Sequence, residues 1–228
     1  MNLEQLAREL YADGKNVAAG LREHLGVTEN TPEIIRLAYD MQAGSYVEAA
    51  TRDDFVMRYA QQLAEHLAPH IDGTLLDVGT GEMTTLSHLV AALPVKPSKV
   101  FASDISGKRL EVGQAYAAVH MPDVPLEVFT ADIAKLPLPD QSIDVITSNH
   151  ALEPNGGREE ELVRELLRVG KKLVLFEPDY ENASDEGKAR MTSHGYITRL
   201  RDYAESVTPL ELLHNPLNPT SCFVIERL

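Results

Sequence analysis

The sequence predicts an α/β fold in which a mostly parallel sheet, flanked by helices, follows a helical N-terminal segment. Two observations support this prediction. From residue 74 onward, short apolar runs alternate with helical stretches, whereas in the first seventy residues the apolar residues recur only at helical spacing. The alternation is typical of right-handed β-α-β units, which form a parallel sheet and place ligands at the carboxyl ends of its strands. We therefore expect residues 1–70 to form a helical cap and residues 71–228 to form the core.

The N-terminal segment carries recognisable helix starts. Apolar residues recur at helical spacing from Leu3 onward, and Thr31-Pro32 offers an N-cap followed by a proline at the first helical position. Asp53 or Asp54 is a candidate N-cap for a further helix before the first strand. These signals predict several short helices ahead of the sheet.

The sequence pattern from residue 71 onward predicts five strands and four helices, followed by two C-terminal strands. The expected strands are 74–78, 99–103, 126–130, 143–148 and 172–177, and the expected helices are 83–93, 107–119, 158–169 and 186–205. The strand-like runs Leu210–His214 and Ser221–Ile225 follow with only a short proline-containing segment between them. A segment of that length cannot hold a crossover helix, so we expect these two strands to pair antiparallel.

The composition argues against several classes of protein. Twenty-one Lys and Arg against 35 Asp and Glu give a net charge of −14, without the clustered cations that hold nucleic acid. The longest apolar runs are of strand length, far below the ~20 residues of a membrane span. The N-terminus lacks the layout of a signal peptide, so a cytoplasmic location without membrane partners is the default expectation. The single cysteine, Cys222, precludes an internal disulfide, and the histidines lack the paired spacing of metal ligands.

The strongest local signal is a strand that runs into a glycine turn and then a helix, over residues 75–82. Glycines at positions 79 and 81 let a ligand approach the backbone, and the free N–H groups of the following helix face that ligand. Asp104, at the end of the second strand, lies 23 residues beyond Gly81, which suits a carboxylate that binds ribose hydroxyls. The pattern predicts a nucleotide-like ligand.

In combination these motifs resemble the class I S-adenosylmethionine (SAM)-dependent methyltransferases, and more narrowly the type 11 group of small-molecule methyltransferases. Asp77-x-Gly79-x-Gly81 is similar to the first motif of the family, residues 39–46 resemble its segment over the SAM methionine, and residues 136–146 resemble its stretch before strand four. The resemblance implies a Rossmann-like, seven-stranded sheet with the last strand antiparallel, SAM as cofactor, and in-line (SN2) transfer of its methyl group to a small polar acceptor. It also implies these cofactor-binding residues: Tyr39, Tyr46, Asp77, Gly79, Thr80, Gly81, Asp104, Ile105, Asp132, Ile133 and Asn149.

One departure from the family concerns the glycine turn. Met83 stands where the family often has a third glycine. Either the amino-acid end of the cofactor packs differently here, with hydroxyls from Thr84 and Thr85, or Met83 packs beneath the turn.

Polar residues after the fourth and fifth strands are the candidate catalytic groups. His150, Glu153 and Glu177 follow these strand ends, where side chains are expected to face the pocket. Each could bind the acceptor or act as a general base; alternatively, His150 is structural and the two glutamates cap helices. The resemblance to a branch of the type 11 group implies a sugar or amino sugar as the acceptor, whereas the sequence itself identifies neither the acceptor, nor the methylated atom, nor the oligomeric state.

Two other functions remain open. A dinucleotide-dependent oxidoreductase also uses Gly79-x-Gly81 with a distant acid, but Thr84 replaces the third glycine of that fingerprint and a helical segment precedes the first strand. A non-catalytic SAM-binding protein would keep the glycine turn and Asp104 but would lack polar groups in its acceptor pocket. The polar tract at residues 149–157 argues against it.

Overall fold

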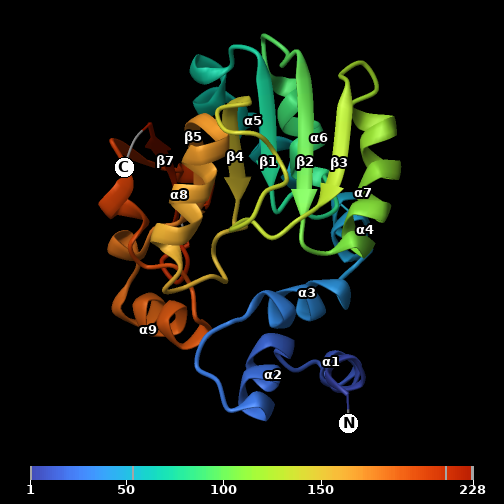
Figure 1. Cartoon of the computed structure of the whole chain (residues 1–228), viewed down its shortest axis with the longest axis vertical. Helices are drawn as coiled ribbons and strands as arrows, with labels where there is room; N and C mark the ends of the chain where they lie inside the picture. Colours follow the sequence, from blue (N-terminus) through green and yellow to red (C-terminus); the bar gives the residue numbers. More distant parts are fainter. Residues whose placement is uncertain (1, 53, 214, 227–228) are drawn as a thin grey trace.

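A computed structural model of the chain describes residues 2–52, 54–213 and 215–226. In this part of the chain seven strands form one sheet in the order β3-β2-β1-β4-β5-β7-β6 (Figure 1). The strands are β1 Thr74–Val78, β2 Lys99–Asp104, β3 Leu126–Thr130, β4 Ile143–Asn149, β5 Gly170–Pro178, β6 Ser206–Pro209 and β7 Thr220–Ile225. The expected seven-stranded, mostly parallel architecture is thereby confirmed.

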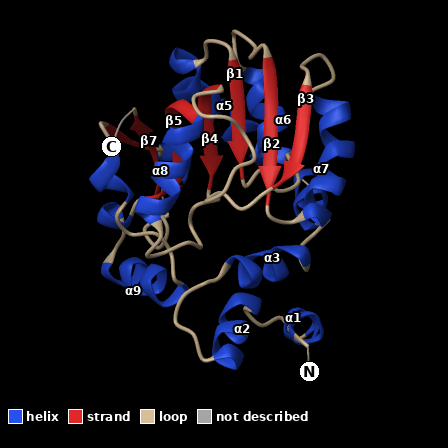
Figure 2. Ribbon diagram, in the orientation of Figure 1, coloured by secondary structure: helices blue, strands red, loops and turns tan. Residues whose placement is uncertain are grey.

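Helices cover both faces of the sheet, and further helices of the N-terminal segment lie beyond its carboxyl edge, as Figure 2 shows. The α-helices are α1 Leu3–Ala12, α2 Val17–Leu25, α3 Pro32–Asp40, α4 Ser45–Ala50, α5 Phe55–Leu67, α6 Thr84–Ala92, α7 Gly107–His120, α8 Glu159–Val169 and α9 Asp185–His194. Four short 3-10 helices are η1 Ala68–His70, η2 Tyr180–Asn182, η3 Leu200–Tyr203 and η4 Glu211–Leu213. Among the described residues no helix is both long and apolar enough to cross a membrane.

Burial on both faces explains why the central strands read as continuous apolar runs. Leu75 belongs to the core on the side of α5, α6 and α7, whereas its neighbour Leu76 belongs to the core on the side of α8. Side chains of a strand point alternately to opposite faces, so an apolar residue is needed at each position. The parallel register places Val78 of β1 beside Ser103 of β2 and Ser148 of β4. These strands therefore end together, and their carboxyl ends form one edge.

The N-terminal helices form two groups. Helices α1 to α3 pack around a small apolar cluster of their own, which includes Leu21 and Ile34, and lie beyond the carboxyl edge of the sheet (Figure 1). Helix α5 instead packs against α6 and contributes Leu63 to the core under the sheet. Its expected cap Asp53 lies outside the described residues, and Asp54 forms an ion pair with Arg58 rather than a side-chain cap. Within residues 1–70, helices α1 to α3 thus have their own small core, whereas α5 belongs to the core of the sheet.

The C-terminal region differs from the prediction in two places. The helix expected over residues 186–205 ends at His194, because Gly195 adopts φ 68 and terminates it in the left-handed conformation that glycine favours. The strand expected over residues 210–214 is also wrong within the described part of that range: the strand that pairs with β7 is β6, and η4 follows it. Pro209 is tolerated at the end of this edge strand, and Leu210 N beyond it still donates to Thr220 O. The predicted antiparallel pairing is confirmed, as β7 is antiparallel to both β5 and β6.

Candidate functional site

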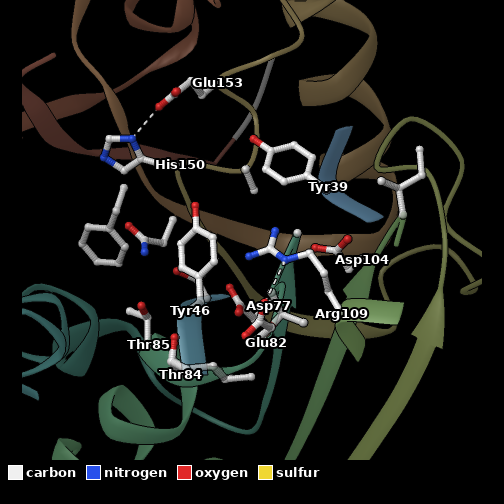
Figure 3. A pocket seen from close by; sticks show the side chains of 18 of the residues that line it. Tyr39, Tyr46, Asp77, Glu82, Thr84, Thr85, Asp104, Arg109, His150 and Glu153 are labelled. Carbon is white, nitrogen blue, oxygen red and sulfur yellow. Dashed lines mark hydrogen bonds and ion pairs between the residues drawn. The ribbon is translucent and has the colours of Figure 1, made fainter. Parts of the chain in front are cut away.

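The carboxyl edge of the sheet opens into a cavity of about 440 Å³ that is covered by α3, α4 and the start of α5 (Figure 3). Of the residues predicted from the sequence to form the site, all but Gly81 and Glu177 line this cavity. The lining members are Tyr39, Tyr46, Asp77, Gly79, Thr80, Asp104, Ile105, Asp132, Ile133, Asn149, His150 and Glu153. The fold therefore brings together residues that are far apart in the sequence.

The glycine turn after β1 requires two residues without side chains. Gly79 and Gly81 adopt φ 64 and φ 57. A Cβ atom on Gly79 would lie 2.3 Å from the Cβ of Ala151, and one on Gly81 would lie 2.4 Å from Nη2 of Arg109. Gly79 is thus needed for conformation and for space, whereas Gly81 is needed for its conformation.

Met83 packs beneath the turn, as the second interpretation of this departure expected. Its side chain is fully buried in the core, and its backbone adopts φ 54, a left-handed conformation that favours glycine. Thr84 and Thr85, which begin α6, line the cavity beside it. A methionine at this position therefore keeps the backbone path of a glycine.

Two buried acids mark one half of the site. Asp104 Oδ2 accepts a hydrogen bond from Gly81 N at 2.9 Å, and Oδ1 accepts one from Ser106 N at 2.7 Å. Burial raises the pKa of Asp104. Burial, together with the negative charges of Asp104 and Glu177, also raises the pKa of Asp77 to about 7. A positively charged ligand would favour the ionised form of both acids.

A hydrogen-bonded pair marks the other half. His150 follows β4 in a left-handed conformation, with φ 53. Its Nδ1 lies 2.6 Å from Oε2 of Glu153, and its Nε2 lies 2.7 Å from Oγ1 of Thr220. Burial alone would lower the pKa of His150, but the hydrogen bond and charge of Glu153 outweigh it and raise this pKa. The imidazole ring is therefore fixed in orientation and paired with an acid that also lines the cavity.

Glu177 lies beneath this loop, outside the cavity lining. Its Oε1 accepts hydrogen bonds from Ser148 Oγ at 2.7 Å, Ala151 N at 3.0 Å and Leu152 N at 3.1 Å, and its Oε2 accepts one from Glu153 N at 3.2 Å. Burial raises its pKa to about 7. The geometry gives this carboxylate a positioning role, because it holds the backbone that carries His150 and Glu153.

Several lining residues were not identified from the sequence. The Tyr59 hydroxyl donates to Oδ1 of Asn149, which connects α5 to the end of β4. Glu82 accepts hydrogen bonds from Gly44 N at 2.9 Å and Val47 N at 2.8 Å, and so connects the glycine turn to α4. Arg109, on α7, also lines the cavity and lies near Asp77, Glu82 and Asp104 (Figure 3). A charged residue on the buried face of a helix is the sequence signal that could have indicated Arg109.

In the part of the chain that the structure describes, no group of three or more His, Cys, Asp or Glu side chains is arranged to hold a metal ion.

The central part of the chain matches a known protein family. Residues 76–176 match the model of a family described as "Methyltransferase domain". An uncharacterized 37.1 kDa protein of a Streptomyces fradiae transposon is 29% identical over 161 residues, which cover 69% of this chain and 45% of that protein. The chain thus spans less than half the length of this relative.

Solved structures show the same fold. A SAM-dependent methyltransferase from Aquifex aeolicus superposes with a TM-score of 0.57 at 18% identity, over 80% of this chain and 98% of that one. The magnesium protoporphyrin IX methyltransferase of Synechocystis, solved with bound SAH, superposes with a TM-score of 0.60 at 14% identity, over 86% and 100% of the two chains.

Proposed function

We propose that this chain is a class I SAM-dependent methyltransferase, which uses SAM as its cofactor and transfers the methyl group of SAM to a small-molecule acceptor by in-line displacement. One observation carries the proposal. The glycine turn with Asp104 and the His150–Glu153 pair line the same cavity, so a cofactor and an acceptor can meet there.

The residues at the β1 and β2 ends fit SAM. The backbone of the glycine turn reaches the cavity at Gly79 and Thr80, and Asp104 keeps lone pairs free for the ribose hydroxyls. Asp77 and Asp104 are buried acids that favour a ligand with a net positive charge, which SAM carries. Ile105, Asp132 and Ile133 would contact the adenine ring.

The remaining part of the cavity is suited to an amphipathic acceptor. Ile35 of α3 and Phe55 and Val56 of α5 give this part an apolar wall, and Phe176 of β5 adds a ring. The polar groups that line the cavity include the His150–Glu153 pair, Asn155 and Asn218. An apolar wall beside these groups supports an amphipathic acceptor that carries hydroxyl or amine groups.

The protein's main contribution is alignment. SAM supplies a methyl group that its sulfonium already activates, so the chain needs to hold the acceptor in line with the S–CH₃ bond and to exclude water. Positioning of this kind lowers barriers by ~7–11 kcal/mol. When the acceptor is protonated, the Glu153 carboxylate, which lines the cavity and is held by His150 Nδ1, can take its proton, and Glu177 keeps the pair in place through the loop backbone.

The experiment that tests the proposal separates binding from turnover. We expect calorimetry to show micromolar binding of SAM, and mass spectrometry to show methylation within a panel of phenols, amines and sugars. His150→Ala should leave the affinity for SAM within about threefold, a change under ~1 kcal/mol, and should lower kcat/KM by ~100-fold if the pair acts as a base. Tight binding of NADH without binding of SAM would contradict the proposal and favour the oxidoreductase. Binding of SAM without turnover of any acceptor would favour the non-catalytic alternative.

A further inference from the structure

Arg109 is a buried cation that the protein itself does not fully pair. The residue is 7% exposed and lines the cavity. Within the described residues its guanidinium makes no hydrogen bond, and its Nε is buried without a partner. The nearest ion-pair partner is Glu82, with 3.8 Å between Nε and Oε1, beyond hydrogen-bond distance.

The neighbouring carboxylates do not need this cation to satisfy their oxygens. Both oxygens of Glu82 accept backbone N–H groups of the α4 region, and both oxygens of Asp104 accept backbone N–H groups beside β2. A guanidinium carries five N–H donors in a planar fork that matches a carboxylate. Leaving the Nε–H of this fork unmatched at a buried site is costly unless a ligand pairs with the guanidinium.

The surrounding structure fixes where the guanidinium lies. Gly113 lets α7 approach the glycine turn closely, because a Cβ at this position would lie 2.8 Å from the carbonyl carbon of Glu82. Arg109 is one helical turn before Gly113, so its side chain reaches over the turn. The rings of Tyr39 and Tyr46 lie 5.1 and 4.6 Å from its guanidinium carbon and hold it by cation–π contacts (Figure 3).

We propose that Arg109 binds the carboxylate of the methionine end of SAM. The inference rests on the proposed function. That carboxylate is the one anionic group of SAM, and Asp77, Glu82 and Asp104 around the turn would repel it. The Arg109 guanidinium can bind this carboxylate in a bidentate manner, in a position that the rings of Tyr39 and Tyr46 stabilise. The arrangement makes Arg109 a positioning residue that selects ligands carrying the intact amino-acid end.

The test compares ligands that differ in that carboxylate. Calorimetry would measure the affinities of SAM, decarboxylated SAM and methylthioadenosine, which lacks the whole amino-acid end, for the wild type, Arg109→Met and Arg109→Lys. Arg109→Met should weaken the binding of SAM by roughly 10- to 100-fold and leave methylthioadenosine within about threefold, because charge-assisted pairs of this kind have that strength. Arg109→Lys, which keeps the charge and loses the fork, should fall between. Arg164→Met, which removes a cation from an exposed pair on α8, is the matched control and should change neither affinity.

The outcomes separate the inference from the proposed function. Failure of the wild type to bind SAM would contradict the proposed function itself. If the wild type binds SAM and Arg109→Met loses the same factor of affinity for SAM and for methylthioadenosine, Arg109 contacts the nucleoside end. That result would overturn the inference. Tighter binding of SAM by the variant would also overturn it, because Arg109 would then obstruct the site. Thermal unfolding of each variant checks that the contacts to Tyr39 and Tyr46 are not needed for folding.

Discussion

Two acids at the same edge of the sheet have different roles in the two halves of the pocket. Asp104 follows β2 and holds the glycine turn, whereas Glu177 near the end of β5 holds the loop after β4. Asp104 accepts two backbone hydrogen bonds, and Glu177 accepts three backbone hydrogen bonds and one from Ser148. An ionised carboxylate offers about four lone-pair sites. Glu177 therefore uses its capacity within the protein, whereas Asp104 keeps about half of it free, and we propose that two ribose hydroxyls use this free half.

This difference shows that the position after a strand does not by itself define a ligand-binding residue. What decides is how many protein donors the loop directs at the carboxylate. The loop after β4 folds over Glu177 because His150 takes the left-handed conformation, which turns the N–H groups of the next residues inward. The turn after β1 directs only one N–H group, that of Gly81, at Asp104.

The largest effect is expected for Glu177→Ala. It leaves four donors without their acceptor in a fully buried site, so we expect the free energy of unfolding to fall by ~3–5 kcal/mol. Glu177→Gln keeps one oxygen for most of these donors and should cost ~1–2 kcal/mol. Urea unfolding measures both changes, with Glu160→Ala on the exposed side of α8 as the matched control. A loss below ~1 kcal/mol in Glu177→Ala would mean that the acid does not hold the loop.

The second effect is a loss of stability as the pH rises. Asp77 and Glu177 have pKa values raised to about 7, so the folded state keeps protons that the unfolded state has released above about pH 4.5. The folded state then binds more protons, and the free energy of unfolding falls with pH, by ~2–3 kcal/mol for each acid between pH 5 and 8. The raised pKa of His150 acts in the same direction above pH 6.5. Urea unfolding across this range should show the slope, and Asp77→Asn should flatten it; a flat profile in the wild type would contradict the assignment.

Much of the fold could be predicted because the sheet is buried on both faces. Strands 74–78 and 126–130 agree with the structure residue for residue. The apolar run of the first follows from burial, whereas the second is an edge strand whose apolar residues are only partly buried. The strand expected over residues 210–214 is misplaced because β6, at the other edge, has mostly exposed residues, whereas the nearby apolar run buries Leu210 outside any strand. Periodicity reports burial, and in β6 burial and strand residues do not coincide.

The candidate site was predictable where a motif sets the backbone and less so where a side chain reaches in from elsewhere. The positions of Gly79, Gly81 and Asp104 follow from a strand, a turn and a helix in sequence order. Arg109 and Tyr59 come from helix faces whose partners are set by tertiary packing, and spacing alone does not report that. The exclusion of Glu177 from the cavity depends on the conformation of His150, which a residue other than glycine rarely adopts.

The smallest effect is expected for Asp104→Ala, which removes the acid that keeps free lone pairs and so tests the comparison with Glu177 directly. Asp104→Ala should weaken the binding of SAM by ~10- to 100-fold, or ~1–3 kcal/mol, because two ribose hydroxyls lose a charged acceptor. Methylthioadenosine carries the same ribose, so its affinity should fall by a similar factor, which distinguishes Asp104 from Arg109. Stability should change less than in Glu177→Ala, because two backbone donors lose their acceptor and the removal of one buried acid relieves the charge on Asp77. Calorimetry with both ligands and urea unfolding of both variants provide the measurements. Equal losses of stability in the two variants, with the affinity for SAM unchanged in Asp104→Ala, would show that both acids serve only to hold loops.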